Sequence, residues 1–446
     1  MVLVLLAVVV VAATALLAVP QWRAAVLPTA SVERSSPPPV GYRAPVTADP
    51  PALPLDELAP AAAPAAKALL DRLAKLPKGA AGRTSVVVAD PQSGQTLIDR
   101  GDRPAIPAST MKLLSALVAQ ETLGNDRTFA TTTVSPNPGT VILRGGGDPL
   151  LSDARADGRA SLQQLAAATA TELTRTGTSR VTLGYDATLF TGRSWHRHWT
   201  ENYSYSVAPI SALMADGART RTGQAEKNPA RTAAMRFAKR LAKAGIAVAA
   251  IKPMVAPADA AELAVVRSTS LEELINQALQ ASDNTAIETL TRQAALASGR
   301  RGDFAGASQT VSDTLSRLGL WAPGMVIDDT CGLSRENRVT PGVLAKAMQL
   351  VLTEERFRSL VAGLPLGGVT GTLSLRFDDA RERAGRGVVR AKTGSLRDVT
   401  ALAGYLVTAD GAPVVFAFIA NDVRRSWDVK DWMDTTTARW AACGCG

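Results

Sequence analysis

The stretch "PASTMKLLSALVAQETL", residues 107–123, joins a polar pair to an apolar run with helical spacing. Its apolar residues recur every three or four positions, which predicts a helix from Ser109 to Leu123. Ser109 and Lys112 stand three positions apart, so their side chains share one face of that helix. The pair is either a nucleophile with its base or two ordinary polar residues at a helix start, and the rest of the sequence must decide.

The segments around this helix predict an α+β fold with one antiparallel sheet flanked by helices. Residues 83–101 hold two β-branched runs around a Pro/Gly turn and predict a hairpin. Near the other end of the chain, "GVVRAKTG", "VTALAGYLVT" and "APVVFAFIA" predict three more strands. A hairpin at one end and a meander at the other favour a single sheet. The spacing of apolar residues predicts helices over 62–76, 160–176, 270–280, 284–296, 307–318, 341–353 and 427–441.

Between these parts, residues 126–255 have a different texture, with short strand-like runs such as "FATTTV" and "SRVTLGYD". They predict a small α/β domain with its own sheet, inserted into a main domain that residues 61–125 and 256–446 form together.

The first 19 residues carry no charge and predict a signal peptide or membrane anchor over residues 1–22. Pro/Ala-rich residues 23–60 predict a linker. We therefore expect an exported protein that acts outside the cytoplasm, either secreted or held at the membrane. The net charge is 49 minus 40, or +9, but arginines are scattered along the chain, which predicts no nucleic-acid partner. A solvated surface explains this charge, with weak attraction to an anionic polymer or membrane as the alternative.

The small number of cysteines and histidines limits the possible disulfides and metal sites. An exported chain permits disulfides, so we expect Cys331 to pair with Cys443 or Cys445. His196 and His198 in "WHRHW" are the chain's two histidines. Without a nearby carboxylate cluster they make a weak zinc site, so the sequence predicts no metal and no cofactor.

Two further motifs decide how the opening stretch is interpreted. Ser282-Asp283-Asn284 falls in the break between two predicted helices, and Lys392-Thr393-Gly394 falls in a predicted strand. S-x-x-K, S-D-N and K-T-G in this order are the set used by serine penicillin-recognising enzymes. The three motifs together predict a catalytic site. For Asp283, a role as a helix-capping carboxylate is at least as plausible as a catalytic role.

This site would act by acyl transfer. Ser109 attacks a carbonyl, and Lys112 takes its proton because burial and the cationic Lys392 keep its amine neutral. Backbone N–H groups of Ser109 and Ser395 would hold the oxyanion. Ser282 would relay a proton to the departing amine.

The remaining groups would bind substrate. Asn284 would hydrogen-bond a substrate amide. Lys392, with the hydroxyls of Thr393 and Ser395, would bind a substrate carboxylate through charge-assisted hydrogen bonds. Gly394 has no side chain, so a peptide could pair with this strand as an added β-strand.

The chain resembles the low-molecular-mass class C penicillin-binding proteins, the D-alanyl-D-alanine carboxypeptidase/endopeptidases of bacterial cell walls. The resemblance runs from about Leu69 to the C-terminus and includes "GGGDPLL", "GYDATLF", "SVAPISAL", "DDTCGLSRENRVTP" and "LPLGGVTGTLSLRF". It implies a transpeptidase-like fold, cleavage of terminal D-alanine or of a D-amino-acid crosslink, and peptidoglycan stem peptides and β-lactams as partners.

The sequence departs from this family at two places. The inserted segment is short, so one of the usual inserted domains is expected to be missing or vestigial. Cys331 stands where a small serine-like residue is expected, and it is either half of a disulfide or a second nucleophile. Asp329 and Ser334 are expected to line the same region.

Two rival functions remain open at this stage. A class A β-lactamase shares the three motifs but deacylates with a glutamate that follows S-D-N, whereas "EELIN" (272–276) precedes Ser282. We therefore expect a long-lived penicillin adduct on Ser109. A non-catalytic cell-wall binder or drug sensor is the other alternative, and such a protein would not need the base Lys112.

Overall fold

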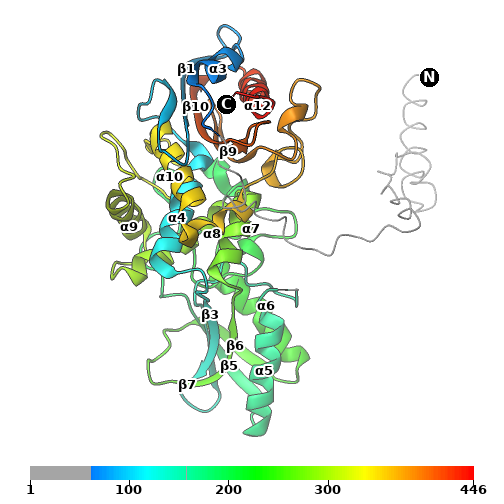
Figure 1. Cartoon of the computed structure of the whole chain (residues 1–446). Coiled ribbons are helices and arrows are strands. Elements are labelled where there is room, and N and C mark those ends of the chain that lie inside the picture. The colour runs from blue at the N-terminus through cyan, green and yellow to red at the C-terminus, as the bar shows by residue number, and fades with distance from the viewer. Residues whose placement is uncertain (1–61, 157, 446) are drawn as a thin grey trace, which may run out of the picture. The chain divides into compact units, whose positions relative to one another are not determined.

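The computed structural model describes residues 62–156 and 158–445 (Figure 1). The signal or anchor segment at 1–22 and the linker at 23–60 lie outside these ranges, so both remain predictions. Within the described ranges, no helix is both long enough and apolar enough to cross a membrane.

The main sheet has five antiparallel strands in the order β2-β1-β10-β9-β8. Strand β1 pairs with β10 along its whole length, from Ala81 opposite Val423 to Ala89 opposite Val415. The prediction of one antiparallel sheet built from both ends of the chain is therefore confirmed. The strands are β1 Ala81–Ala89, β2 Thr96–Arg100, β8 Arg390–Leu396, β9 Val399–Val407 and β10 Pro413–Val423.

Both faces of this sheet are buried, which explains why its central strands are apolar at nearly every position. Val86 and Val88 point to the face that α12 and α3 cover, while Val87 and Ala89 point to the face covered by α4 and α10. Figure 1 shows α12 and α3 on one side of β9 and β10, with α10 and α4 on the other. These helices are α3 Ala66–Arg72, α4 Met111–Leu123, α10 Pro341–Thr353 and α12 Ser426–Ala441.

Three more helices extend the second layer: α7 Leu271–Ala281, α8 Asn284–Ala297 and α9 Phe304–Arg317. Side chains cap their first turns, since Ser270 accepts from the N–H of Glu273 and Asp303 from that of Gly306. The helix predicted over 62–76 is shorter than expected. The short elements are α11 Leu360–Gly363 and the 3₁₀ turns Ala108–Thr110, Glu201–Tyr205, Asp216–Ala218, Glu355–Phe357, Gly371–Leu373 and Arg383–Gly385.

The inserted segment forms a second five-stranded sheet in the order β6-β5-β4-β3-β7, with α5 and α6 packed on it. Strands β6, β5 and β4 are parallel, whereas β3 pairs antiparallel with β4 and β7. Its last strand ends at Arg267, beyond the boundary of 255 drawn from the sequence. The elements are β3 Ala130–Ser135, β4 Thr140–Arg144, α5 Leu162–Arg175, β5 Arg180–Asp186, α6 Pro229–Lys243, β6 Ala247–Pro253 and β7 Ala261–Arg267.

The predicted disulfide of Cys331 is wrong. Cys443 and Cys445 are joined to each other, and Cys331 is a buried free thiol. The reason lies in the layers: Cys443 and Cys445 pack with α12 on one face of the main sheet, while Cys331 belongs to an apolar cluster with Ile287 of α8. The sheet separates the two regions.

Candidate active site

Ser109 lies in a 3₁₀ turn, Ala108–Thr110, directly before α4, so the helix begins two residues later than predicted. Two glycines let other segments approach this turn closely. A Cβ atom at Gly394 of β8 would lie 2.8 Å from the carbonyl oxygen of Pro107, and one at Gly332 would collide with the carbonyl of Ala108. Glycine is therefore needed at position 394 because β8 packs closely against the turn that contains Ser109. The sequence had suggested a different reason, the pairing of a substrate peptide with this strand.

Lys112 is fully buried, and its ammonium has three partners. Its Nζ donates to Ser109 Oγ at 2.8 Å, to Asn284 Oδ1 at 2.6 Å and to the Cys331 carbonyl at 2.6 Å. Ser109 is therefore in hydrogen-bond contact with the base that the sequence assigns to it.

Lys392 is also fully buried and reaches the second motif. Its Nζ lies 2.9 Å from Ser282 Oγ and 3.0 Å from the carbonyl of Thr393. Ser282 ends α7 in the left-handed region, with φ at 54°, a conformation that costs a non-glycine residue free energy. This turn directs the Ser282 hydroxyl at the lysine of the third motif.

Burial lowers the pKa of both lysines, but their surroundings differ. Carboxylates of Asp329 and Glu288 act to raise the pKa of Lys112, whereas the Lys112 charge lowers the pKa of Lys392 further. The sequence attributed the neutral state of Lys112 to the charge on Lys392 as well as to burial. In the structure burial is the main cause that lowers the pKa of Lys112, and the charge of Lys112 acts to lower the pKa of Lys392.

The remaining predicted residues surround these lysines. Asn284 is buried, and its Nδ2 donates to the carbonyl of Ser206 at 2.8 Å while its Oδ1 accepts from Lys112. Both ends of the amide are thus engaged, so the structure gives Asn284 a part in orienting the base. Thr393 Oγ1 lies 2.7 Å from Thr372 Oγ1, and Ser395 is exposed.

Asp283 caps α8, because its carboxylate accepts from the N–H of Ala286 at 3.0 Å. The interpretation of Asp283 as a helix cap is therefore confirmed.

Sequence reasoning missed Glu288, which lies one helical turn after Asn284 on α8. Its Oε1 accepts from the N–H groups of Thr330 and Cys331, each at 2.8 Å, and so holds the peptide segment whose carbonyl contacts Lys112. Burial, and then the neighbouring Asp329 carboxylate, raises the pKa of Glu288 to about 7. Its spacing of four from Asn284 was the signal that could have found it.

Asp329 organises the loop that follows. Its carboxylate accepts from Trp199 Nε1 at 2.7 Å, Gly332 N at 2.8 Å, Ser334 N at 2.6 Å and Asn337 Nδ2 at 2.7 Å. A buried carboxylate with four donors fixes the loop beside the serine turn.

Two chemical alternatives lose support. Burial raises the pKa of the Cys331 thiol well above its ordinary value, so the thiolate needed for a second nucleophile is disfavoured. Glu288 does follow S-D-N, but it is fully buried and bonded to backbone, which does not suit a base that activates a solvent water.

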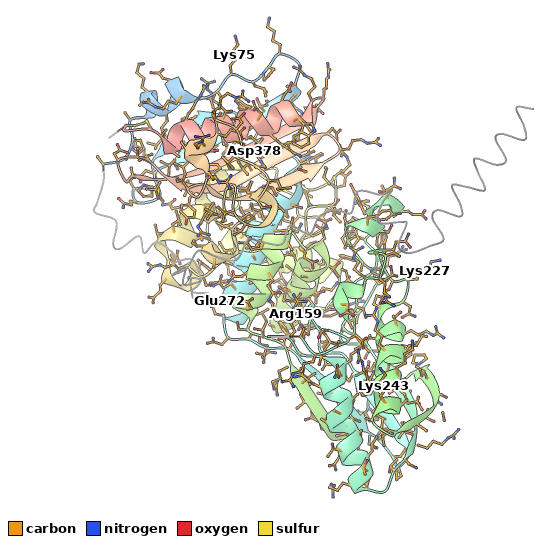
Figure 2. The ribbon with its side chains drawn as sticks, turned by 90° about the vertical axis from the view of Figure 1, so that its right-hand side faces the viewer. Lys75, Arg159, Lys227, Lys243, Glu272 and Asp378 are labelled. Atoms are coloured by element: carbon orange, nitrogen blue, oxygen red, sulfur yellow. A yellow bond between two sulfur atoms is a disulfide. The ribbon has the colours of Figure 1, made fainter. Side chains whose placement is uncertain are left out.

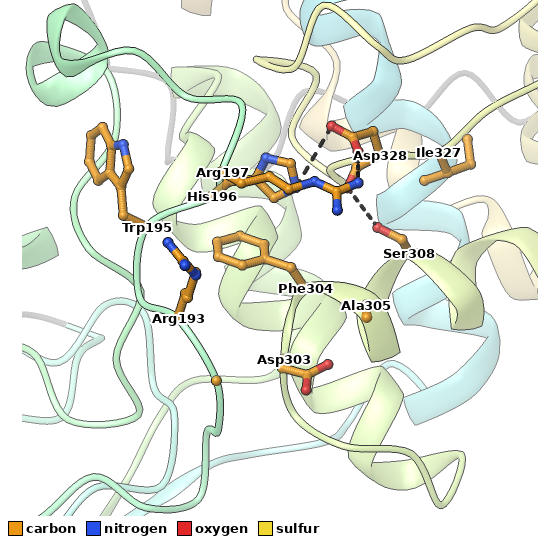
Figure 3. A pocket seen from close by; sticks show the side chains of 11 residues that line it. Arg193, Trp195, His196, Arg197, Asp303, Phe304, Ala305, Ser308, Ile327 and Asp328 are labelled. Carbon is orange, nitrogen blue, oxygen red and sulfur yellow. Dashed lines mark hydrogen bonds and ion pairs between the residues drawn. The ribbon is translucent and has the colours of Figure 1, made fainter.

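The two histidines lie close to a carboxylate, that of Asp328, contrary to the expectation from sequence. Figure 3 shows His196 beside Asp328. His198 Nδ1 lies 2.7 Å from Asp328 Oδ2, and His196 Nε2 lies 3.7 Å from the same oxygen. His196 Nδ1 accepts from the backbone N–H of His198 at 3.2 Å, and Ser334 donates to Asp328. These groups therefore form a hydrogen-bonded network that ties the segment around His196 to the loop after Asp328.

Comparison with known proteins agrees with this geometry. The chain matches the family described as D-Ala-D-Ala carboxypeptidase 3 (S13) over residues 65–229 and 217–441. The two matched segments overlap at residues 217–229.

Two curated relatives align over most of their length. A carboxypeptidase of Mycobacterium tuberculosis is 35% identical over 82% of this chain and 81% of its own. Carboxypeptidase DacB of Mycolicibacterium smegmatis is 33% identical over 90% of this chain and 89% of its own.

Among solved structures, penicillin binding protein 4 of Haemophilus influenzae superposes with a TM-score of 0.66 at 21% identity, covering 80% of this chain and 93% of that protein. This likeness confirms the predicted α+β, penicillin-recognising fold. Since the family match extends over most of the described residues, the chain belongs to the D-Ala-D-Ala carboxypeptidase 3 (S13) family of serine-type carboxypeptidases.

Proposed function

We propose that the protein cleaves D-Ala-D-Ala termini and D-amino-acid crosslinks of peptidoglycan stem peptides through an acyl-enzyme on Ser109. The observation that carries this proposal is the contact of 2.8 Å between Lys112 Nζ and Ser109 Oγ, in which the lysine is buried and held by polar neighbours. A lysine so held can accept the serine proton once it is neutral.

Acylation would proceed in two bond changes. Ser109 Oγ attacks the carbonyl carbon of the penultimate residue while its proton passes to Lys112 Nζ, giving a tetrahedral oxyanion. Backbone N–H groups of Ser109 and Ser395 would stabilise that oxyanion. The C–N bond then breaks, and the departing amine takes a proton delivered through Ser282.

The departing residue carries a carboxylate, which Lys392 and the hydroxyls of Thr393 and Ser395 would bind. This anion would raise the pKa of Lys392, and the positive charge retained there would lower the pKa of Lys112. Binding of the correct substrate thus favours the neutral base. Water then attacks the acyl carbon, and its proton returns to Ser109 Oγ as the ester bond breaks.

β-Lactams would acylate the same serine, because their ring amide and carboxylate present the same groups. Slow deacylation is expected, since Glu288 is sealed from solvent. We further propose that the protein acts outside the cytoplasm, exported or anchored by residues 1–22.

Release of D-alanine from a pentapeptide ending in D-Ala-D-Ala tests this function. Wild-type protein should release one D-alanine per peptide, and a Ser109→Ala variant should release none. Release by the Ser109→Ala variant would refute the assignment, and penicillin binding without any peptide cleavage would favour a drug sensor.

A further inference from the structure

A pocket of about 750 Å³ opens beside the S-D-N motif, on the side of the inserted segment. Ser282 and Asn284 line one end, while Arg159 and Arg219 of the inserted segment line the rest, together with Gln277 of α7. Figure 2 labels Arg159 at the junction between the second sheet and the helices above it. The volume far exceeds what one alanine requires, because pockets of 300–1,000 Å³ hold drug-sized ligands.

Among the described residues, no carboxylate lies within ion-pair distance of either guanidinium group, although the charge of Asp148 acts on Arg159 and that of Asp283 on Arg219. Arg159 Nη2 donates to the neutral amide oxygen of Gln277 at 2.8 Å. Arg219 Nη1 donates to the carbonyls of Ser204 at 2.6 Å and Gly223 at 3.3 Å. Partial burial lowers the pKa of Arg219, while the nearby Asp283 carboxylate acts to raise it.

The two carboxylates that line the pocket are already engaged elsewhere. Asp216 Oδ2 pairs with Arg236 at 2.9 Å, and its Oδ1 accepts from the N–H of Asp153 at 3.0 Å. Asp283 caps α8. Neither carboxylate is hydrogen-bonded to Arg159 or Arg219, so guanidinium N–H groups that no protein acceptor uses can bind an anion.

The turn that presents Arg219 is held in a costly conformation. Asp216, Gly217 and Ala218 all have positive φ, at 53°, 63° and 54°. Arg236 of α6 fixes this turn by donating to the carbonyls of Ala215 and Arg219, each at 3.2 Å. Strain maintained by such a clamp is typical of functional sites.

We propose that this pocket binds the second stem peptide of a crosslink, the part that departs when the crosslink is cut, through carboxylates that pair with Arg159 and Arg219. The inference rests on the proposed function, because the pocket begins at Ser282, which there passes a proton to the departing amine. A departing D-alanine ends at its carboxylate, whereas a departing stem peptide continues beyond it and carries further carboxylates. The pocket would therefore favour crosslinked substrates over monomeric ones.

Kinetics on two substrates test this inference. The value of kcat/KM is measured for a monomeric pentapeptide and for a crosslinked stem-peptide dimer, with wild type, Arg159→Gln and Arg219→Gln. Arg180→Gln serves as the matched control, because Arg180 is an exposed arginine of the second sheet outside the pocket. Acylation by a fluorescent penicillin identifies variants in which Ser109 still reacts.

Each pocket variant should lower the dimer-to-monomer ratio of kcat/KM about tenfold, the equivalent of one charge-assisted hydrogen bond, and Arg180→Gln should leave the ratio unchanged. An unchanged ratio in both pocket variants would overturn the inference. So would wild-type protein that releases D-alanine but leaves the dimer intact, and that result would leave the carboxypeptidase part of the proposed function standing. Protein that cleaves neither substrate would refute the proposed function itself.

A binding measurement covers the case in which Arg219→Gln disturbs its loop. In a Ser109→Ala background, the dimer should bind more weakly after Arg159→Gln, and the loss should shrink as salt is added. Equal affinity with and without Arg159→Gln would contradict the inference.

Discussion

The helical side and the strand side of the active site each carry one buried lysine, and the two sides stabilise charge differently. Lys112 of α4 contacts a serine, an amide oxygen and a carbonyl, with the carboxylates of Glu288 and Asp329 nearby. Lys392 of β8 contacts Ser282 and the carbonyl of Thr393, and no carboxylate contributes to its pKa. Carboxylates of the protein thus act on one lysine, and under the proposed function the substrate carboxylate would act on the other.

The largest effect is expected on the helical side. Lys112→Ala should lower the rate of Ser109 acylation by penicillin by about a thousandfold, within the usual range for a general base. Stopped-flow fluorescence with a labelled penicillin measures this rate. Lys239→Ala, at an exposed position of α6, is the control and should acylate normally. A tenfold loss or less at Lys112 would mean that another group is the base.

The strand side should respond to the substrate's own charge. Lys392→Ala should reduce kcat/KM roughly 10- to 100-fold for a peptide ending in a free carboxylate, the equivalent of one to two charge-assisted hydrogen bonds. For the same peptide with a C-terminal amide the reduction should be much smaller. A D-alanine or D-alaninamide release assay gives both values, and equal reductions would show that Lys392 does not recognise the carboxylate.

Glu288 should influence how acylation and stability depend on pH. Because its carboxylate raises the pKa of Lys112, Glu288→Gln should move the acidic limb of the acylation profile to lower pH. The folded-state pKa of Glu288, about 7, lies above the ordinary value of 4.5, so its favourable contribution to stability is present below that ordinary value and lost as pH rises through 7.

Thermal melting checks the expected effect of Glu288 on stability. Compared with wild type, Glu288→Gln should gain more in Tm at pH 8.5 than at pH 5.5. Glu288→Leu should lower Tm at both values, since it leaves two buried N–H groups without an acceptor. A Tm difference between Gln and wild type that does not vary with pH would show that Glu288 is not buried as described.

The smallest effect concerns the cysteines. Cys331→Ser should leave no titratable thiol in the unfolded, unreduced protein, because Cys443 and Cys445 remain joined to each other. A thiol-reactive dye measures the number of free thiols in each unfolded protein. Wild type should show one thiol. Two thiols in the variant would show that Cys443 and Cys445 are not joined to each other and would restore the pairing of Cys331 with the C-terminus.

Sequence alone predicted the main sheet well, because strands with continuous apolar runs such as β9 and β10 leave few alternatives. It also identified the three motifs, whose order is their signal. It did not predict what holds Lys112, since Glu288 and Asp329 act through backbone groups far along the chain. The proposed roles of Arg159 and Arg219 could not be predicted for a similar reason: single arginines have no sequence signature, and only the fold brings them into one pocket with Ser282.

The cysteine prediction failed because spacing carries no information about which face of a sheet a residue reaches. The two sulfur atoms of "CGCG" are close through local geometry alone, whereas Cys331 lies behind the sheet from them.

The most direct test of the account is mass-spectrometric mapping of the protein after brief exposure to penicillin. The account predicts one added penicilloyl group, carried by the peptide that contains Ser109 and still present after excess drug is removed. An adduct on another residue, or drug consumed without any adduct on Ser109, would contradict it.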